Sequence, residues 1–122
     1  MNLPTKGRGG LFHSLAAFGY SIKGLTAAWQ REIAFRQEVL IGVPMLVAAP
    51  WLAPDRTGLV LMMGSVVLVW CAELINTGLE AICDAVSEET HPLLGVAKDT
   101  GSAAVLLSLA LCALTWIVLL AG

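Results

Sequence analysis

The stretch VLVWCAELINTGLEAICDAV, residues 67–86, joins an apolar run to four polar side chains at helical spacing. Counted from Glu73, the residues Asn76, Glu80 and Asp84 follow at offsets of 3, 7 and 11. On an α-helix these four positions fall within about 80° of one another. Ionisable groups at membrane depth normally face protein, water or an ion, so this face indicates a functional site. For Asp84, near the end of the stretch, exposure to solvent explains the residue equally well.

The composition around this stretch is that of a membrane protein. The chain has 122 residues, of which 57% are hydrophobic and 13% charged, whereas a soluble domain carries about 25% charged residues. We therefore expect one integral membrane unit over residues 1–122. Three cysteines without metal-ligand spacing are interpreted as small packing side chains: Cys71, Cys83 and Cys112.

The hydrophobic pattern predicts an all-α membrane protein with an amphipathic surface helix and three transmembrane helices. Apolar residues from Leu11 to Trp29 recur at alternating spacings of 4 and 3, which is typical of a helix lying in the membrane interface. Pro44 falls within the first span, and Pro92 is expected to break the helix after the second span. The expected segments are a tail over 1–10, an interfacial helix over 11–29, spans over 30–53, 58–86 and 100–121, and a polar loop over 87–101.

The distribution of basic residues predicts the orientation in the membrane. Of the seven Lys and Arg, three precede the first span, Arg31 and Arg36 lie at its start, Arg56 alone lies in the first loop, and Lys98 lies in the second loop. The positive-inside rule then places the N-terminus and the 87–101 loop in the cytoplasm. The polar face of residues 73–84 consequently lies at the cytoplasmic end of its span.

Oxygen ligands of this kind suit Mg²⁺ better than zinc, because no Cys or His set accompanies them. Two other function classes remain open on the residues alone. A small cation- or proton-conducting protein would use the carboxylates, but such pathways normally need polar groups through the whole membrane. A non-enzymatic membrane subunit would leave Glu73 without a role. We expect no nucleic-acid partner.

Three segments of the chain resemble the prokaryotic integral-membrane diacylglycerol kinase family. They are AAWQREIAFRQE at 27–38, AELINTGLEAICDAV at 72–86 and AKDTGSAAVLL at 97–107. The resemblance runs from about Phe12 to the end of the chain. It implies a homotrimer with active sites shared between subunits in the bacterial inner membrane. It also implies transfer of the γ-phosphoryl group of MgATP to diacylglycerol, which gives phosphatidic acid.

The resemblance also implies roles for individual residues. Glu73 resembles the general base, and Glu32 and Glu80 resemble the metal-holding carboxylates. The expected ATP-binding residues are Tyr20, Glu32, Glu80, Glu89, His91, Lys98 and Asp99. The expected substrate-binding residues are Trp29, Arg36, Glu73, Asn76 and Ser102. The chain departs from the family at three positions that often carry arginine, where it has His13, Thr26 and Val96.

The choice of lipid stays open. A related branch of the same family phosphorylates undecaprenol, which presents its hydroxyl at the same membrane depth as diacylglycerol. We expect diacylglycerol to be the substrate, with undecaprenol as the alternative.

Overall fold

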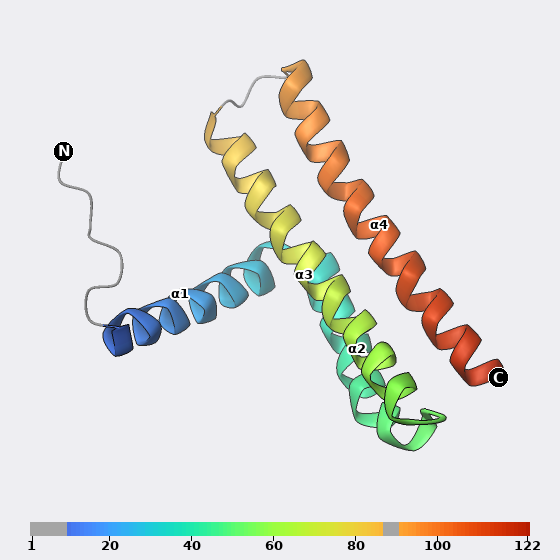
Figure 1. The fold of residues 1–122 in the computed structure, drawn as a ribbon. Helices are drawn as coiled ribbons and strands as arrows, with labels where there is room; N and C mark the ends of the chain where they lie inside the picture. Colours follow the sequence, from blue (N-terminus) through green and yellow to red (C-terminus); the bar gives the residue numbers. More distant parts are fainter. Residues whose placement is uncertain (1–9, 87–90) are drawn as a thin grey trace.

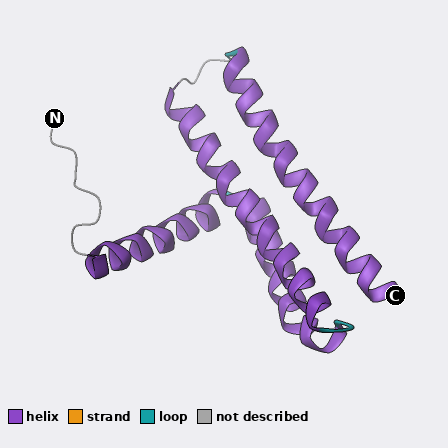
Figure 2. Cartoon of the chain, in the orientation of Figure 1, coloured by secondary structure: helices purple, strands orange, loops and turns teal. Residues whose placement is uncertain are grey.

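A computed structural model describes residues 10–86 and 91–122 of the chain. Four helices account for nearly all of them: α1 (Gly10–Arg31), α2 (Ile33–Leu52), α3 (Arg56–Val86) and α4 (Pro92–Ala121). Helices α2, α3 and α4 run alongside one another, and α1 projects to one side (Figure 1). The described residues contain helices and short connections and no strand (Figure 2). The predicted all-α fold is thus confirmed.

Three of the helices are long and apolar enough to cross a membrane, namely α2, α3 and α4. Many of their large apolar side chains face outward, including Leu107 at 71% and Ile117 at 65% exposure. In a bilayer such side chains contact lipid tails or other apolar helices at no hydrophobic cost. Helix α1 also leaves its apolar stripe uncovered, with Phe18 67% exposed and Ala28 as its single buried residue.

The chain between α1 and α2 breaks at one residue, Glu32, which has an extended backbone. Arg36 explains why α1 ends there. Its guanidinium donates to the carbonyl oxygen of Trp29 and, at 2.9 Å, to that of Gln30. These carbonyls belong to the last turn of α1, where a cation and a hydrogen-bond donor satisfy free acceptors. The break turns the chain from the direction of α1 into that of α2.

The turn between α2 and α3 is capped by Asp55. Its Oδ1 accepts a hydrogen bond of 2.6 Å from the backbone N–H of Gly58 in the first turn of α3. Asp is among the residues that best satisfy the free N–H groups at a helix start. Helix α2 itself contains Pro44 and Pro50 and continues through both. The connection between α2 and α3 is therefore short and carries a side-chain cap.

The core lies at the end of the bundle near this turn. It contains Ala49 from α2, three residues of α3, and Cys112 and Trp116 from α4, all buried. Trp116 Nε1 donates to the carbonyl oxygen of Met62 at 3.1 Å and to Ser65 Oγ at 3.2 Å. Because lipid supplies no hydrogen bonds, such internal pairs satisfy polar groups between membrane helices. This end of the molecule is a packed structural unit.

Helix α4 begins at Pro92, so the interpretation of residues 92–99 as part of a loop is wrong. Pro92 occupies the first helical position, where its missing N–H costs no hydrogen bond. The side chain of His91 caps the helix by accepting from the N–H of Leu93 at 3.1 Å. Pro92 starts a helix here instead of ending one. Lys98 and Asp99 consequently lie on a helix with fixed spacing to Gly101 and Ser102.

Candidate active site

The polar face of α3 lies at the end of the bundle opposite the core, where α1 meets α2 and α4 begins. Glu73 is 5% and Asn76 9% exposed, Glu80 is half-buried, and Asp84 is exposed. Burial therefore decreases along the face toward the end of α3. Glu73 is therefore the least accessible of the three carboxylates, and Asp84 is the most accessible.

Glu32 and Glu80 form a carboxylate pair across the α1–α2 break. The Glu80 side chain within hydrogen-bonding reach, partial burial and the negative charge of Glu80 together raise the pKa of Glu32 to about 6. Asn76 Nδ2 donates to Glu80 Oε1 at 3.3 Å and so orients one side of the pair. Two neighbouring carboxylates repel each other, and a cation bound between them would relieve that repulsion.

These residues fit a magnesium ion held partly by nucleotide phosphates. Mg²⁺ in kinases is commonly bound by one or two carboxylates, with phosphate oxygens and water completing its shell. Glu32 and Glu80 supply two carboxylates, and the buried Asn76 Oδ1 beside them has no hydrogen-bond partner. Within residues 10–86 and 91–122, no group of three or more His, Cys, Asp or Glu side chains is arranged to hold a metal.

Glu73 has a partner that the sequence analysis did not identify, namely Glu38 of α2. The two carboxyl groups are within hydrogen-bonding reach of each other. Glu38 Oε2 is fully buried and accepts no N–H or O–H from the described protein groups. The Glu38 carboxyl group thus lies against Glu73 with one of its oxygens left without a donor in the described part of the chain. An ionisable residue near the start of an apolar span was a usable signal for Glu38.

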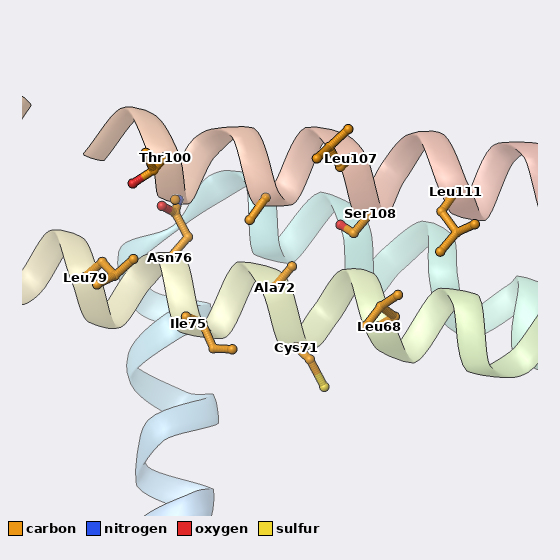
Figure 3. A pocket seen from close by; sticks show the side chains of 12 residues that line it. Leu68, Cys71, Ala72, Ile75, Asn76, Leu79, Thr100, Leu107, Ser108 and Leu111 are labelled. Carbon is orange, nitrogen blue, oxygen red and sulfur yellow. The ribbon is translucent and has the colours of Figure 1, made fainter. Parts of the chain in front are cut away.

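Asn76 lies in the seam between α3 and α4, at one end of a groove of about 530 Å³ (Figure 3). Apart from Asn76 and Thr100 at this end and Ser108 further along, the labelled side chains that line the groove are mostly apolar. A Cβ atom on Gly101 would lie 2.3 Å from Asn76 Oδ1, so only glycine fits against the amide as it stands. The close approach of α4 to α3 is what buries Asn76.

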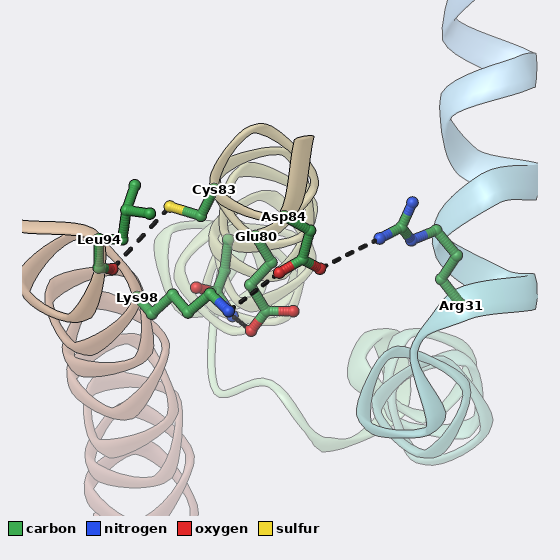
Figure 4. Close-up of polar contacts among 7 residues, drawn as sticks. Arg31, Glu80, Cys83, Asp84, Leu94 and Lys98 are labelled. Atoms are coloured by element: carbon green, nitrogen blue, oxygen red, sulfur yellow. Dashed lines mark hydrogen bonds and ion pairs between the residues drawn. The ribbon is translucent and has the colours of Figure 1, made fainter. Parts of the chain in front are cut away.

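Lys98 reaches the same end of the molecule from α4. Its Nζ donates to Asp84 Oδ1 at 2.9 Å, and Arg31 lies 3.9 Å from Asp84 Oδ2 (Figure 4). The expected ATP contact Lys98 is therefore held by a carboxylate close to Glu80. Arg31, at the end of α1, joins this group from the other side of α3.

The remaining expected site residues are dispersed in the described chain. Tyr20 and Ser102 are exposed, and Asp99 is exposed near Lys98 without a side-chain hydrogen bond in the described structure. Arg36 caps α1, as described above, and Trp29 borders an apolar hollow of about 400 Å³ with Trp70. His91 caps α4. The position expected for Glu89 lies outside the described residues.

Residues 19–120 match the family model described as prokaryotic diacylglycerol kinase. The chain is 45% identical over 111 residues to the diacylglycerol kinase of Escherichia coli strain K12, covering 91% of each chain. It is 43% identical over 119 residues to that of Pseudomonas aeruginosa strain PAO1, covering 98% of this chain and 97% of the relative. With three membrane-span helices and a carboxylate-rich site at one end of them, this chain belongs to the prokaryotic diacylglycerol kinase family.

Proposed function

We propose that this chain transfers the γ-phosphoryl group of ATP to the hydroxyl of diacylglycerol, forming phosphatidic acid and ADP. The observation that carries the proposal is the arrangement of Glu73, Asn76 and Glu80 on one face of α3, with Glu32 and Lys98 brought to it by other helices. The likeness to relatives named diacylglycerol kinase supports the choice of lipid.

Glu73 is the general base of this reaction. As the lipid hydroxyl oxygen attacks the γ-phosphorus, its proton passes to Glu73 and the bond to the β-phosphate oxygen breaks. The burial of Glu73 excludes water, which would otherwise compete with the lipid for the phosphoryl group. Glu38 keeps the Glu73 carboxyl group in one orientation through the contact described above.

Glu32 and Glu80 would hold Mg²⁺, and Asn76 fixes the orientation of Glu80. The ion, when bound with the nucleotide, neutralises charge on the transferring phosphate. Lys98 and Asp99 contact the nucleotide, with Tyr20, Glu89 and His91 at its border. The lipid binds near Trp29, Arg36 and Ser102. These assignments follow the family resemblance, and the position of Lys98 beside Asp84 supports its part in them.

We further propose a homotrimer in the bacterial inner membrane, with the N-terminus and the 87–101 segment in the cytoplasm. The dispersion of Tyr20, Ser102 and Asp99 within one chain supports a site completed by a neighbouring subunit. The seam groove between α3 and α4 and the uncovered face of α1 leave apolar surface for such a subunit. The basic residues before α2 support the orientation.

The test is transfer of labelled γ-phosphate from ATP in mixed micelles that contain diacylglycerol and undecaprenol side by side. We expect label in diacylglycerol, and only with Mg²⁺ present. Label in undecaprenol alone would reassign the substrate to the alternative lipid. If folded protein labels neither lipid, the kinase proposal is wrong. A proton or cation flux that ignores ATP would then favour the conducting protein.

A further inference from the structure

Asp84 is the one member of the polar face of α3 to which the proposed reaction gives no role. It lies one helical turn beyond Glu80 and is in contact with cations from two other helices. Its Oδ1 accepts from Lys98 Nζ at 2.9 Å, and its Oδ2 lies 3.9 Å from a guanidinium nitrogen of Arg31. Figure 4 shows Lys98 reaching Asp84 from α4 and Arg31 reaching it from α1, with α3 between them.

These contacts contribute little to the stability of the fold. All three side chains are about half exposed, at 51% for Arg31, 57% for Asp84 and 47% for Lys98. Exposed ion pairs are screened by water and salt and pay for the loss of side-chain freedom. Long cationic side chains at an exposed helix end otherwise sample many rotamers. The main effect of Asp84 is therefore to restrict where the two cationic groups lie.

We propose that Asp84 is a positioning residue for the nucleotide, and this rests on the proposed kinase function. It holds the Lys98 ammonium and the Arg31 guanidinium beside Glu80, so that a metal-bound polyphosphate meets two cations already in place. Preordered cations lose less freedom when phosphate oxygens bind them, which favours the bound state. Arg31 thereby becomes a second phosphate contact, at the end of α1.

The test is a kinetic comparison of wild type with Asp84→Asn, in which the amide keeps the shape of the side chain and removes its charge. We expect the apparent KM for MgATP to rise roughly three- to tenfold, because the cations lose their anchor. The KM for diacylglycerol and kcat at saturating MgATP should stay within about twofold of wild type, since Asp84 touches neither the lipid nor Glu73. Asp55→Asn is the matched control, because it removes the same charge at the opposite end of α3.

A double-mutant cycle with Lys98→Met separates positioning from a general charge effect. If Asp84 acts through Lys98, its loss adds little to KM once Lys98 is removed. An Asp84→Asn variant with an unchanged or lowered KM for MgATP overturns the proposal. So does a double variant whose fold-change in KM equals the product of the fold-changes of the two single variants. If Asp84→Asn does not fold, Asp84→Glu decides the question. Its KM should stay within about twofold of wild type, and a KM as high as that of Lys98→Met overturns the proposal. If the wild-type protein itself transfers no phosphate to lipid, the proposed kinase function is wrong, and this outcome is distinct from a failure of the Asp84 proposal.

Discussion

The contact between Gly101 and Asn76 makes a sharp prediction about the site. In Gly101→Ala the added Cβ would lie 2.3 Å from Asn76 Oδ1 and 3.2 Å from Leu79 Cδ1. Ordinary contacts need about 3.5 Å, so the amide must move by about 1 Å. This movement strains or breaks the hydrogen bond of 3.3 Å from Asn76 Nδ2 to Glu80 Oε1. The carboxylate pair proposed to hold the metal, Glu32 and Glu80, then loses its orienting group.

The expected loss is larger in activity than in stability. An off-rotamer amide and one lost hydrogen bond together cost about 1–3 kcal/mol. Alanine in place of glycine stabilises a helix by about 1 kcal/mol, which offsets part of this cost. The net loss in the free energy of unfolding is therefore at most about 2 kcal/mol. A displacement of about 1 Å in a catalytic site can lower turnover by as much as 100-fold, and we expect a loss of at least about tenfold here.

The assay pairs labelled phosphate transfer with thermal unfolding followed by tryptophan fluorescence in detergent micelles. Gly95→Ala is the matched control on α4, because a Cβ there meets nothing within 4 Å. This control should keep wild-type turnover and equal or exceed wild-type stability by up to about 1 kcal/mol. If Gly101→Ala behaved like Gly95→Ala in both measurements, Asn76 would not be held against α4, and the reasoning would be refuted.

Three further predictions address other parts of the molecule. Gly42→Ala places a Cβ 2.7 Å from the Trp70 ring and 2.9 Å from Val66, so the free energy of unfolding should fall by about 1–3 kcal/mol. The control Gly64→Ala should keep the wild-type free energy of unfolding, because a Cβ there meets nothing within 4 Å. The pKa of Glu32 is raised from 4.5 to about 6. Because the folded state binds the Glu32 proton more tightly than the unfolded state, this residue contributes its full stabilisation below pH 4.5 and loses it as the pH rises through 6. In magnesium-free micelles the free energy of unfolding should therefore decline between pH 4.5 and 6 by less than about 1 kcal/mol after solvent screening. Glu80→Gln should reduce this pH dependence. If the variant keeps the pH dependence of the wild type, Glu80 does not act on Glu32. Glu73→Gln should abolish phosphoryl transfer with an unchanged unfolding midpoint, and retained turnover would remove Glu73 as the base.

The helical periodicity of residues 67–86 was sufficient to predict the polar face of α3, because side-chain direction on one helix depends only on spacing. Helix ends were predicted less well. Pro92 was interpreted as a helix breaker, although it starts α4, because proline is compatible with a first turn and not with an interior. The single-residue break at Glu32 also escaped prediction, since it depends on Arg36 reaching back to the last carbonyls of α1.

By itself the sequence determined the all-α fold, the three apolar spans and the face that carries Glu73, Asn76 and Glu80, because each follows from composition or from spacing along one helix. Only the tertiary structure decided which group each side chain meets. Glu38 reaches Glu73, Glu32 reaches Glu80, and Asp84 joins Lys98 to Arg31. These pairs span different helices, and the way separate helices pack depends on side-chain shape and close approach, as at Gly101, which local periodicity does not encode.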